Sequence, residues 1–229
     1  MFKKIVGAFF FVMALIALIG VLAGGVVDSI PAVMGAMLPI GMYIFSGIFF
    51  FTFDGVYSQP YVKGFQTRGK QNTMIVISMV VYFLFFLITC VSVAAAGGDN
   101  YLLDVVTKCW AYFVPFMIFA TCFSLYVVPY MSCKKNVLNT PAAVEGYLSA
   151  NQQYYSFSQT NKVLANEYAL FLPRAFCVIP YQQLQTVKHV KQLGEEVVYF
   201  YLTNGKKISI STRQYQDIAK ALQAYQQFR

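Results

Sequence analysis

The chain has 229 residues, of which 58% are hydrophobic and only 11% are charged. The hydrophobic fraction is well above that of ordinary soluble domains and the charged fraction is far below it, which excludes a wholly water-soluble protein. The net charge of +8 does not indicate nucleic-acid binding, because most of the cations lie beside apolar segments or in the tail. Anionic lipid head groups are the simpler partner there, and no nucleic-acid partner is expected.

Charged residues are almost absent from three long stretches of the first 133 residues. From Lys134 onward they return at ordinary density, with eleven Lys or Arg against five Asp or Glu. We therefore expect a transmembrane domain over residues 1–133 and a cytoplasmic α+β domain over residues 134–229. The predicted fold class is an α-helical membrane bundle followed by a small domain with an antiparallel sheet and a C-terminal helix.

Four apolar segments are long enough to cross a hydrocarbon core of roughly 30 Å. The expected spans are residues 5–27, 30–53, 73–96 and 105–131. Prolines at positions 39 and 115 lie inside two of them and predict kinks. A signal peptide is the alternative for the first segment, but the apolar run is longer than a typical signal core and no good cleavage site follows it.

Orientation follows from the cations in the short loops. Residues 54–72 form the only long polar interruption of the membrane region, and we expect a basic loop there. With four spans, seven cations fall on one side: Lys3, Lys4, Lys63, Arg68, Lys70, Lys134 and Lys135. The opposite loops carry Asp28, Asp99 and Asp104 but no Lys or Arg. This bias predicts that both termini are cytoplasmic, in a plasma or inner membrane.

Few residues inside the spans suggest a role beyond anchoring. Gly20 and Gly24 have a small-xxx-small spacing and are candidate positions for close helix packing, within the chain or between copies. Ion and proton pathways normally keep ionisable side chains near the middle of the membrane, and these spans have none there. A pore or a proton-coupled transporter is therefore disfavoured.

The five cysteines leave two questions open. Cys90 and Cys109 lie near the outer face on consecutive spans, where they either form a disulfide or pack as small apolar side chains. Cys133 is a juxtamembrane position of the kind that is acylated in eukaryotes, or else a packed thiol. The chain has one histidine and no C-x-x-C motif, so neither a metal nor a cofactor is expected.

The tail is expected to combine helices and strands. Thr140-Pro141 is an N-cap followed by a first-turn proline, which predicts a helix from Pro141 to about Tyr154. Strands are then expected in residues 162–172, 175–179 and 183–190. Ser211–Gln214 matches a capping box, so a final helix should run to about Gln227. Its apolar stripe consists of Tyr215, Ile218, Leu222 and Tyr225.

The strongest local signal in the chain is Asn204-Gly205 between two β-rich runs. This dipeptide is typical of a two-residue type I′ hairpin, since both positions need positive φ. Such a turn pairs Tyr201 with Ile208 and Tyr199 with Ile210, and we expect those four residues to face the core. Val198, Phe200 and Leu202 would then lie on the other face.

Ile179-Pro180-Tyr181 enters one of these strands, and the hairpin ends with Asn204-Gly205-Lys206-Lys207 before the terminal amphipathic helix. This order resembles the pleckstrin-homology-like domains that bacterial membrane proteins carry after a few transmembrane helices. The resemblance covers residues 160–228 and none of the membrane region. It implies a small curved sheet capped by a helix and used for protein or lipid-surface interaction rather than catalysis. No lipid-binding residue can be carried over.

Catalysis is not expected. The single histidine, His189, lies in a strand beside lysines, and Glu195-Glu196 reads as a solvated turn. The leading hypothesis is a non-enzymatic membrane protein whose cytoplasmic domain docks a protein partner, another copy of itself or the anionic inner membrane surface. Its candidate binding residues are Lys188, Lys191, Lys206, Lys207 and Arg213. The alternatives are a small transporter or channel-forming subunit, and an oligomeric structural or assembly protein.

Overall fold

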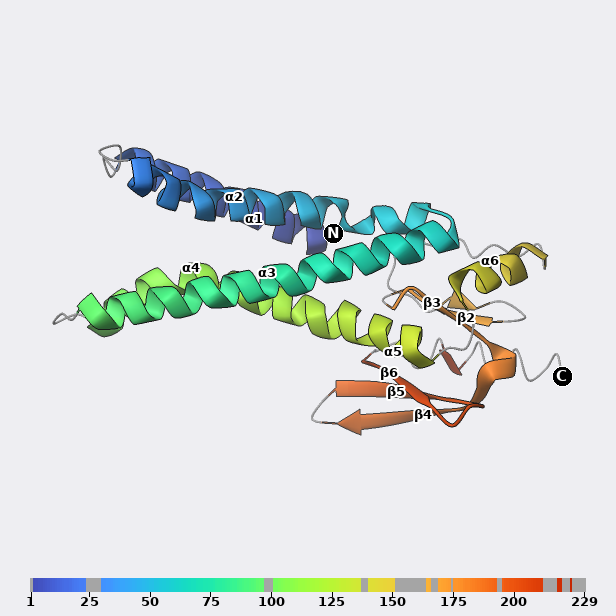
Figure 1. Cartoon of the computed structure of the whole chain (residues 1–229). Helices are drawn as coiled ribbons and strands as arrows, with labels where there is room; N and C mark the ends of the chain where they lie inside the picture. The colour runs from blue at the N-terminus through green and yellow to red at the C-terminus, as the bar shows by residue number, and fades with distance from the viewer. Residues whose placement is uncertain are drawn as a thin grey trace. The chain divides into compact units, whose positions relative to one another are not determined.

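The computed structural model describes residues 2–23, 30–96, 101–136, 140–150, 164–165, 169–173, 175–192, 195–211, 218, 219 and 223 (Figure 1). It contains two compact units, Met1–Val56 and Tyr57–Arg229. Each unit is described by itself. The boundary expected after residue 133 is the point where the chain leaves the membrane. The division into two compact units does not test that boundary, so it stays a prediction.

The first unit is an antiparallel helical hairpin of α1 (Phe2–Ala23) and α2 (Ile30–Thr52), and the 3₁₀ turn η2 (Phe53–Ser58) begins at its end. Two glycines allow the helices to approach closely. A Cβ atom at Gly7 would lie 2.8 Å from the ring of Phe51, and one at Gly47 would lie 2.9 Å from the ring of Phe11. Each helix thus has a glycine whose missing side chain leaves room for a phenylalanine ring of the other helix.

Four helical segments are long and apolar enough to cross a membrane, as expected. They are Lys3–Ala23, Met37–Tyr57, Tyr61–Ala95 and Cys109–Asn136. Large apolar side chains on them are exposed, among them Leu22, Ile88 and Val91 at 59–69%. Exposed apolar surface of this extent is unfavourable in water and suits a lipid environment. The four apolar helices are confirmed, while their insertion and sidedness stay predictions.

The expected basic loop is mostly helix. Helix α3 runs from Tyr61 to Ala96, so residues 61–72 belong to it rather than to a connection. Its buried stripe continues at helical spacing through Gly64, Arg68, Asn72 and Ile75. The sequence did not reveal this helix because two members of the stripe are polar. The first turn is capped from outside: the Val62 amide donates to Glu145 Oε2 at 2.8 Å.

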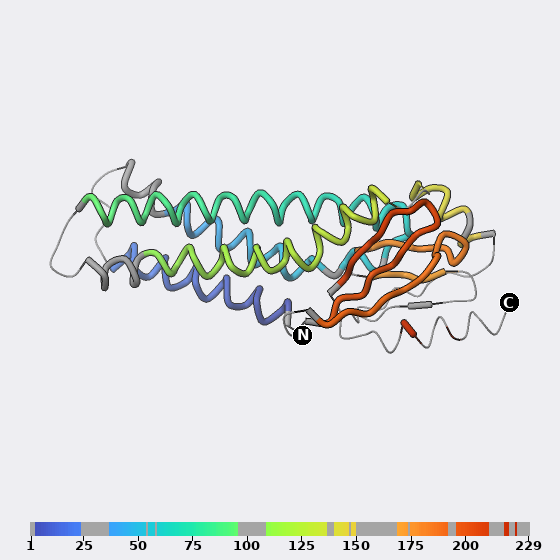
Figure 2. The backbone as a smooth tube through the Cα atoms, turned by 90° about the horizontal axis from the view of Figure 1, so that it is seen from below, coloured from blue at the N-terminus to red at the C-terminus, as the bar shows by residue number. Residues whose placement is uncertain are grey.

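The expected fourth span has three parts: α4 (Tyr101–Cys122), a π-helical turn η3 (Phe123–Val127) and α5 (Val128–Asn136). Helix α4 packs beside α3 (Figure 2), and the rings of Tyr82 and Phe119 stack 5.7 Å apart between them. At η3 the Val128 amide donates to Phe123 O, five residues back. Pro129, just beyond, lacks an amide hydrogen, which favours such local loosening.

Beyond α5 the expected helix is present as α6 (Pro141–Ala150), and Thr140 Oγ1 accepts from the Ala143 amide at 3.3 Å as its cap. The strands form two antiparallel sheets in the order β1-β2-β3 and β4-β5-β6. Their bounds are β1 Leu164–Ala165, β2 Ala169–Leu172, β3 Cys177–Pro180, β4 Leu184–Gln192, β5 Glu195–Leu202 and β6 Lys207–Ser211, with a 3₁₀ turn η4 at Tyr181–Gln183.

The hairpin between β5 and β6 has a three-residue loop, Thr203–Gly205, so the predicted type I′ turn is wrong. Leu202 N donates to Lys206 O at 2.8 Å, Gly205 N donates to Leu202 O at 3.0 Å, and Gly205 alone has positive φ, at 76°. Asn204 instead uses its side chain: Nδ2 donates to Asn136 O and Oδ1 accepts from the Lys206 amide.

The longer loop shifts the register by one residue and exchanges the two faces. The structure pairs Tyr201 with Lys207 and Phe200 with Ile208. The side chains expected on the second face, Val198, Phe200 and Leu202, are therefore the buried ones. They join Ile208 and Ile210 in a core that also holds residues of β2, β3 and α5. Tyr199 and Tyr201 face outward.

Most of the expected C-terminal helix lies outside the described part of the chain. Residues 218, 219 and 223 are helical. Ile218 of the expected stripe is fully buried in the core. Tyr215, Leu222 and Tyr225 are not described.

Candidate functional site

A cleft of about 920 Å³ opens between the first half of α3 and the η3–α5 segment. We call it the inner cleft; its walls are formed by parts of Phe65–Val76 and Phe123–Lys134, with Pro141 at one edge. The lining is mostly apolar, with Val76, Phe123 and Val127 among its members. Clefts of this size that combine apolar walls with a few polar groups are typical ligand sites.

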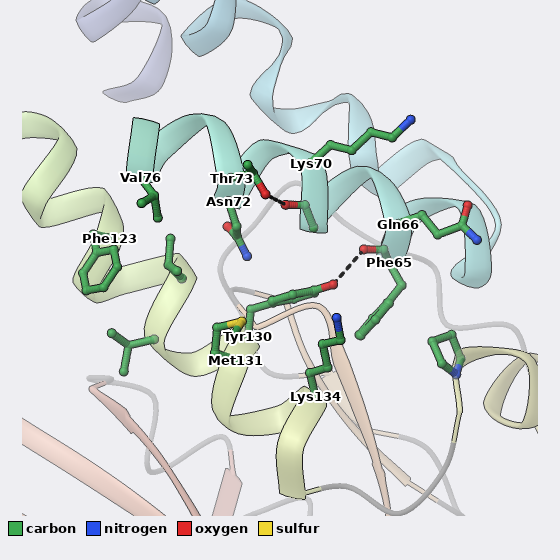
Figure 3. Close-up of a pocket in the computed structure, with 14 residues that line it drawn as sticks. Phe65, Gln66, Lys70, Asn72, Thr73, Val76, Phe123, Tyr130, Met131 and Lys134 are labelled. Atoms are coloured by element: carbon green, nitrogen blue, oxygen red, sulfur yellow. Dashed lines mark hydrogen bonds between the residues drawn. The ribbon is translucent and has the colours of Figure 1, made fainter. Parts of the chain in front are cut away.

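Asn72 is the unusual residue of the inner cleft. Its side chain points from α3 toward α5, near Tyr130 and Met131 (Figure 3). It is only 4% exposed, and within the described part of the chain neither its amide nitrogen nor its oxygen has a hydrogen-bond partner. A buried amide without a partner costs about 1–3 kcal/mol, so its persistence needs an explanation.

Lys70 and Lys134 stand at the rim of the cleft, one on each wall, and both are exposed. In Figure 3 the Lys134 side chain extends toward Phe65 and Tyr130, whereas the Lys70 ammonium points away along α3. A lysine ammonium sits on a flexible four-carbon stem, so a change of rotamer would bring the Lys70 charge to the mouth. The cleft thus combines an apolar interior, a buried amide and a cationic rim.

Tyr130 closes one side of the cleft. Its hydroxyl donates to Phe65 O at 3.4 Å, and its ring lies 4.9 Å from the ring of Phe65. Gly69 makes room for it: a Cβ atom there would lie 2.9 Å from Tyr130 Oη. The glycine therefore sets how closely α5 approaches α3 below the cleft.

Arg68, expected in a solvated loop, is fully buried on α3. Its Nη2 donates to Tyr57 Oη at 2.8 Å, and that hydroxyl donates to Pro173 O at 3.3 Å. The guanidinium also lies 5.4 Å from the ring of Tyr126 in η3. A single cation therefore joins α3, the π-helical turn and the connection between β2 and β3.

The β2–β3 connection packs against the start of α3 through Phe176. This residue has φ = 47°, which is strained for a side chain with a Cβ. Its ring stacks on Tyr61 at 5.7 Å, and Tyr61 Oη accepts from the Val178 amide at 3.3 Å. These contacts hold the β1–β3 sheet on the first turn of α3, and they compensate the strained backbone.

The expected basic residues of the tail do not form one patch. Lys188 and Lys207 share the exposed face of the β4–β6 sheet with Tyr199 and Tyr201. Each ammonium lies over a ring, Lys188 over Tyr201 at 5.5 Å and Lys207 over Tyr199 at 5.1 Å. We call these four residues the tyrosine–lysine face.

The other expected residues lie elsewhere. Lys191 pairs with Glu196 in the register and so points to the opposite side of β4. Lys206 follows the hairpin loop, and Arg213 is outside the described residues. Gly20 has open space around it, and Gly24 is not described, so their role in helix packing stays a prediction.

The structure gives the surroundings of the cysteines in both open questions. Cys90 Sγ and Cys109 Sγ lie 3.3 Å apart across α3 and α4 as free thiols. Cys133 is 1% exposed and packs in the core, so acylation there would require it to leave that core. Among the described residues, no cluster of three or more metal-ligating side chains occurs.

Sequence reasoning missed the inner cleft, Asn72 and the tyrosines of the sheet face. The signal for the cleft was the helical spacing of Arg68 and Asn72 with Ile75, which an apolar pattern search passes over. No family model, curated protein or solved structure matches this chain. Its function must therefore be inferred from these surfaces alone.

Proposed function

We propose that the chain is a four-span integral membrane protein without catalytic activity, with both termini in the cytoplasm. In this proposal the tail, residues 134–229, docks to the anionic inner surface of the membrane. The tyrosine–lysine face carries the proposal: two amphipathic rings and two exposed ammonium groups lie together on one face of the β4–β6 sheet. Tyrosine and lysine both suit a surface that is apolar on one side and wet on the other.

The orientation rests on the distribution of cations. Seven Lys or Arg residues lie in the segments assigned to one side and none in the loops assigned to the other. A reporter that is active only in the cytoplasm, fused after Arg229, is expected to be active. Activity of an export-dependent reporter at the same position instead would reverse the orientation and remove the proposed role of the tail.

Docking can be measured in the full-length protein. An environment-sensitive fluorescent amino acid at Ser209, which is exposed on the same side of β6, reports the polarity around the tyrosine–lysine face. We expect a blue-shifted emission in nanodiscs with anionic lipid compared with zwitterionic nanodiscs. Replacing Lys188 and Lys207 by Glu should abolish the difference, whereas Lys191→Glu, on the opposite side of β4, should preserve it.

Equal emission in both kinds of nanodisc would refute docking to an anionic surface. A protein cross-linked to the same position in native membranes would then assign the face to a protein partner or a second copy.

Residues 160–228 are also proposed to be pleckstrin-homology-like; the two antiparallel sheets and the helical residue Ile218 are compatible with that resemblance.

A further inference from the structure

We infer that the inner cleft binds one anionic phospholipid of the inner leaflet. Its phosphate would lie between Lys70 and Lys134 at the rim, its ester region against Asn72, and the start of an acyl chain along the apolar wall. The inference extends the proposed function to a second, separate surface. It uses the same orientation, because the cleft lies at the end of α3 that is assigned to the cytoplasm.

The first support is the position of the cleft on the helices. Its apolar residues Val76 and Phe123 lie nearer the apolar, membrane-spanning parts of α3 and of the α4–η3–α5 segment. Lys70 and Lys134 lie nearer the start of α3 and the end of α5, which the proposal assigns to the cytoplasm. A phospholipid has the same polarity along its length, with apolar chains below a charged head group. The cleft and a phospholipid therefore both change from apolar to charged toward the proposed cytoplasmic side.

The second support is Asn72. A carbonyl oxygen of a lipid ester accepts hydrogen bonds, and the Asn72 amide nitrogen is a buried donor without an acceptor. The amide is placed on the cleft wall between apolar neighbours, where water-soluble anions have little to contact. A ligand that presents an ester group at the depth of Asn72 and an anion at the rim satisfies both features.

The third support is the build of the walls. The π-helical turn η3 forms one wall, and such turns often mark functional sites. Gly69 and Tyr130 set the approach of α5 to α3 at one side of the cleft, and Arg68 of α3 contacts Tyr126 of η3 directly. The cleft is thus bounded by two helical segments that are held together by specific polar contacts.

Native mass spectrometry of the full-length protein tests the inference. Protein released from nanodiscs that contain equal amounts of phosphatidylglycerol and phosphatidylcholine should retain one phosphatidylglycerol. Lys70→Gln and Lys134→Gln should each lower the affinity about fivefold, as expected for one cation near an anionic lipid surface. Asn72→Leu should weaken retention of both lipids, because it removes the ester contact but not the charges.

The controls separate this site from the tyrosine–lysine face. Lys63→Gln removes an exposed lysine of the same helix outside the cleft and should leave retention unchanged. Replacing Lys188 and Lys207 by Gln should also leave retention unchanged while it abolishes the Ser209 emission shift. A wild-type protein that retains the lipid but shows no Ser209 emission shift refutes the docking proposal alone. A wild-type protein that shows the shift but retains no lipid refutes the cleft alone.

Three results would overturn the inference. The first is unchanged retention in the double variant of Lys70 and Lys134 to Gln, with a normal elution profile that shows a folded protein. The second is equal retention of phosphatidylcholine and phosphatidylglycerol by the wild type. The third is displacement of the lipid by inorganic phosphate or glycerol phosphate at low concentration, because the site would then bind a soluble anion and not a lipid.

Discussion

Arg68 contacts side chains from two other segments of the second unit. It is the largest fully buried side chain of the described residues and contacts Tyr57 and Tyr126 from the middle of a helix stripe. A buried cation is costly unless its surroundings satisfy it, so the hydroxyl and the two rings are needed as much as the arginine. Removing any of them leaves the others in an unfavourable environment.

We expect Arg68→Ala to destabilise the protein by about 2–4 kcal/mol, from a lost hydrogen bond to a charged group and lost cation–π contacts. The measurement is the apparent melting temperature in detergent by size-exclusion chromatography. Lys63→Ala, an exposed position on the same helix, should change stability by no more than about 0.5 kcal/mol. Equal melting temperatures for both variants would contradict the buried role of Arg68.

The proximity of Cys90 and Cys109 makes a second residue-scale prediction. Copper phenanthroline should remove two electrons and two protons from the thiols and join the sulfurs, which already lie 3.3 Å apart. After denaturation, two fewer thiols should then react with a maleimide polymer. Cys90→Ser should prevent that loss. If all five thiols of the wild type still react after copper phenanthroline treatment, α3 and α4 pack differently from the structure.

At the scale of elements, the α1–α2 hairpin depends on glycines that the small-xxx-small pattern did not identify. Gly47→Leu forces a side chain into the ring of Phe11 and should cost about 1–3 kcal/mol. Gly20→Leu adds a side chain into open space and should leave the hairpin intact. Chemical denaturation of both variants in detergent provides the comparison, and a larger loss for Gly20→Leu would contradict the hairpin packing.

The Gly20 variant also addresses oligomerisation. If Gly20 packs against another copy, Gly20→Leu should reduce the yield of chemically cross-linked dimers in membranes while the monomer stays folded. Unchanged cross-linking would remove the glycine pair as an assembly surface. The transporter alternative is tested separately by a flux assay on the reconstituted protein, for which the proposed function expects no transport above lipid alone.

The register of the β5–β6 hairpin can be checked in the same way. Phe200 is fully buried while Tyr199 is half-buried on the outer face. Phe200→Ser should therefore cost about 3 kcal/mol or more, and Tyr199→Ser about 1 kcal/mol or less. The register of a two-residue turn would give the opposite order, so urea denaturation of the two variants distinguishes the registers.

At the scale of the whole molecule, the tail is not an independent attachment to its helices. Cys133 of α5 belongs to the core that holds β2, β3, β5 and β6, and Tyr61 of α3 contacts Phe176 and Val178. Asn136 also holds the hairpin, since its Nδ2 donates to Lys207 O at 3.0 Å. The strands and the apolar helices of this unit therefore stabilise each other.

We accordingly expect a fragment of residues 136–229 to be poorly folded in water, because it lacks Cys133 and exposes the surface that covers Tyr61. Residues 57–229 in detergent should unfold cooperatively. Circular dichroism during thermal unfolding measures both fragments. A sharp transition in the shorter fragment would show that the tail folds alone and would weaken any role of the helix contacts in holding it.

The four apolar helices, the cap at Thr140 and the strand at residues 183–190 could all be read from the sequence. Each depends on composition or spacing within one short segment: a long apolar run, a capping residue, an alternating pattern. Burial in lipid or against a sheet follows such patterns whatever the rest of the chain does. The two faces of the β5–β6 hairpin were assigned the wrong way round from the same kind of pattern.

The start of α3, the hairpin register and the inner cleft depend on partners that are distant in the sequence. Glu145 caps Val62, Asn136 binds Asn204, and Tyr57 with Tyr126 makes a helical interior acceptable for Arg68. A polar side chain has no fixed preference for the interior or the surface until its partners are in place, because its hydrogen bonds set the cost of burial. Local patterns carry no information on such partners, and folding supplies them.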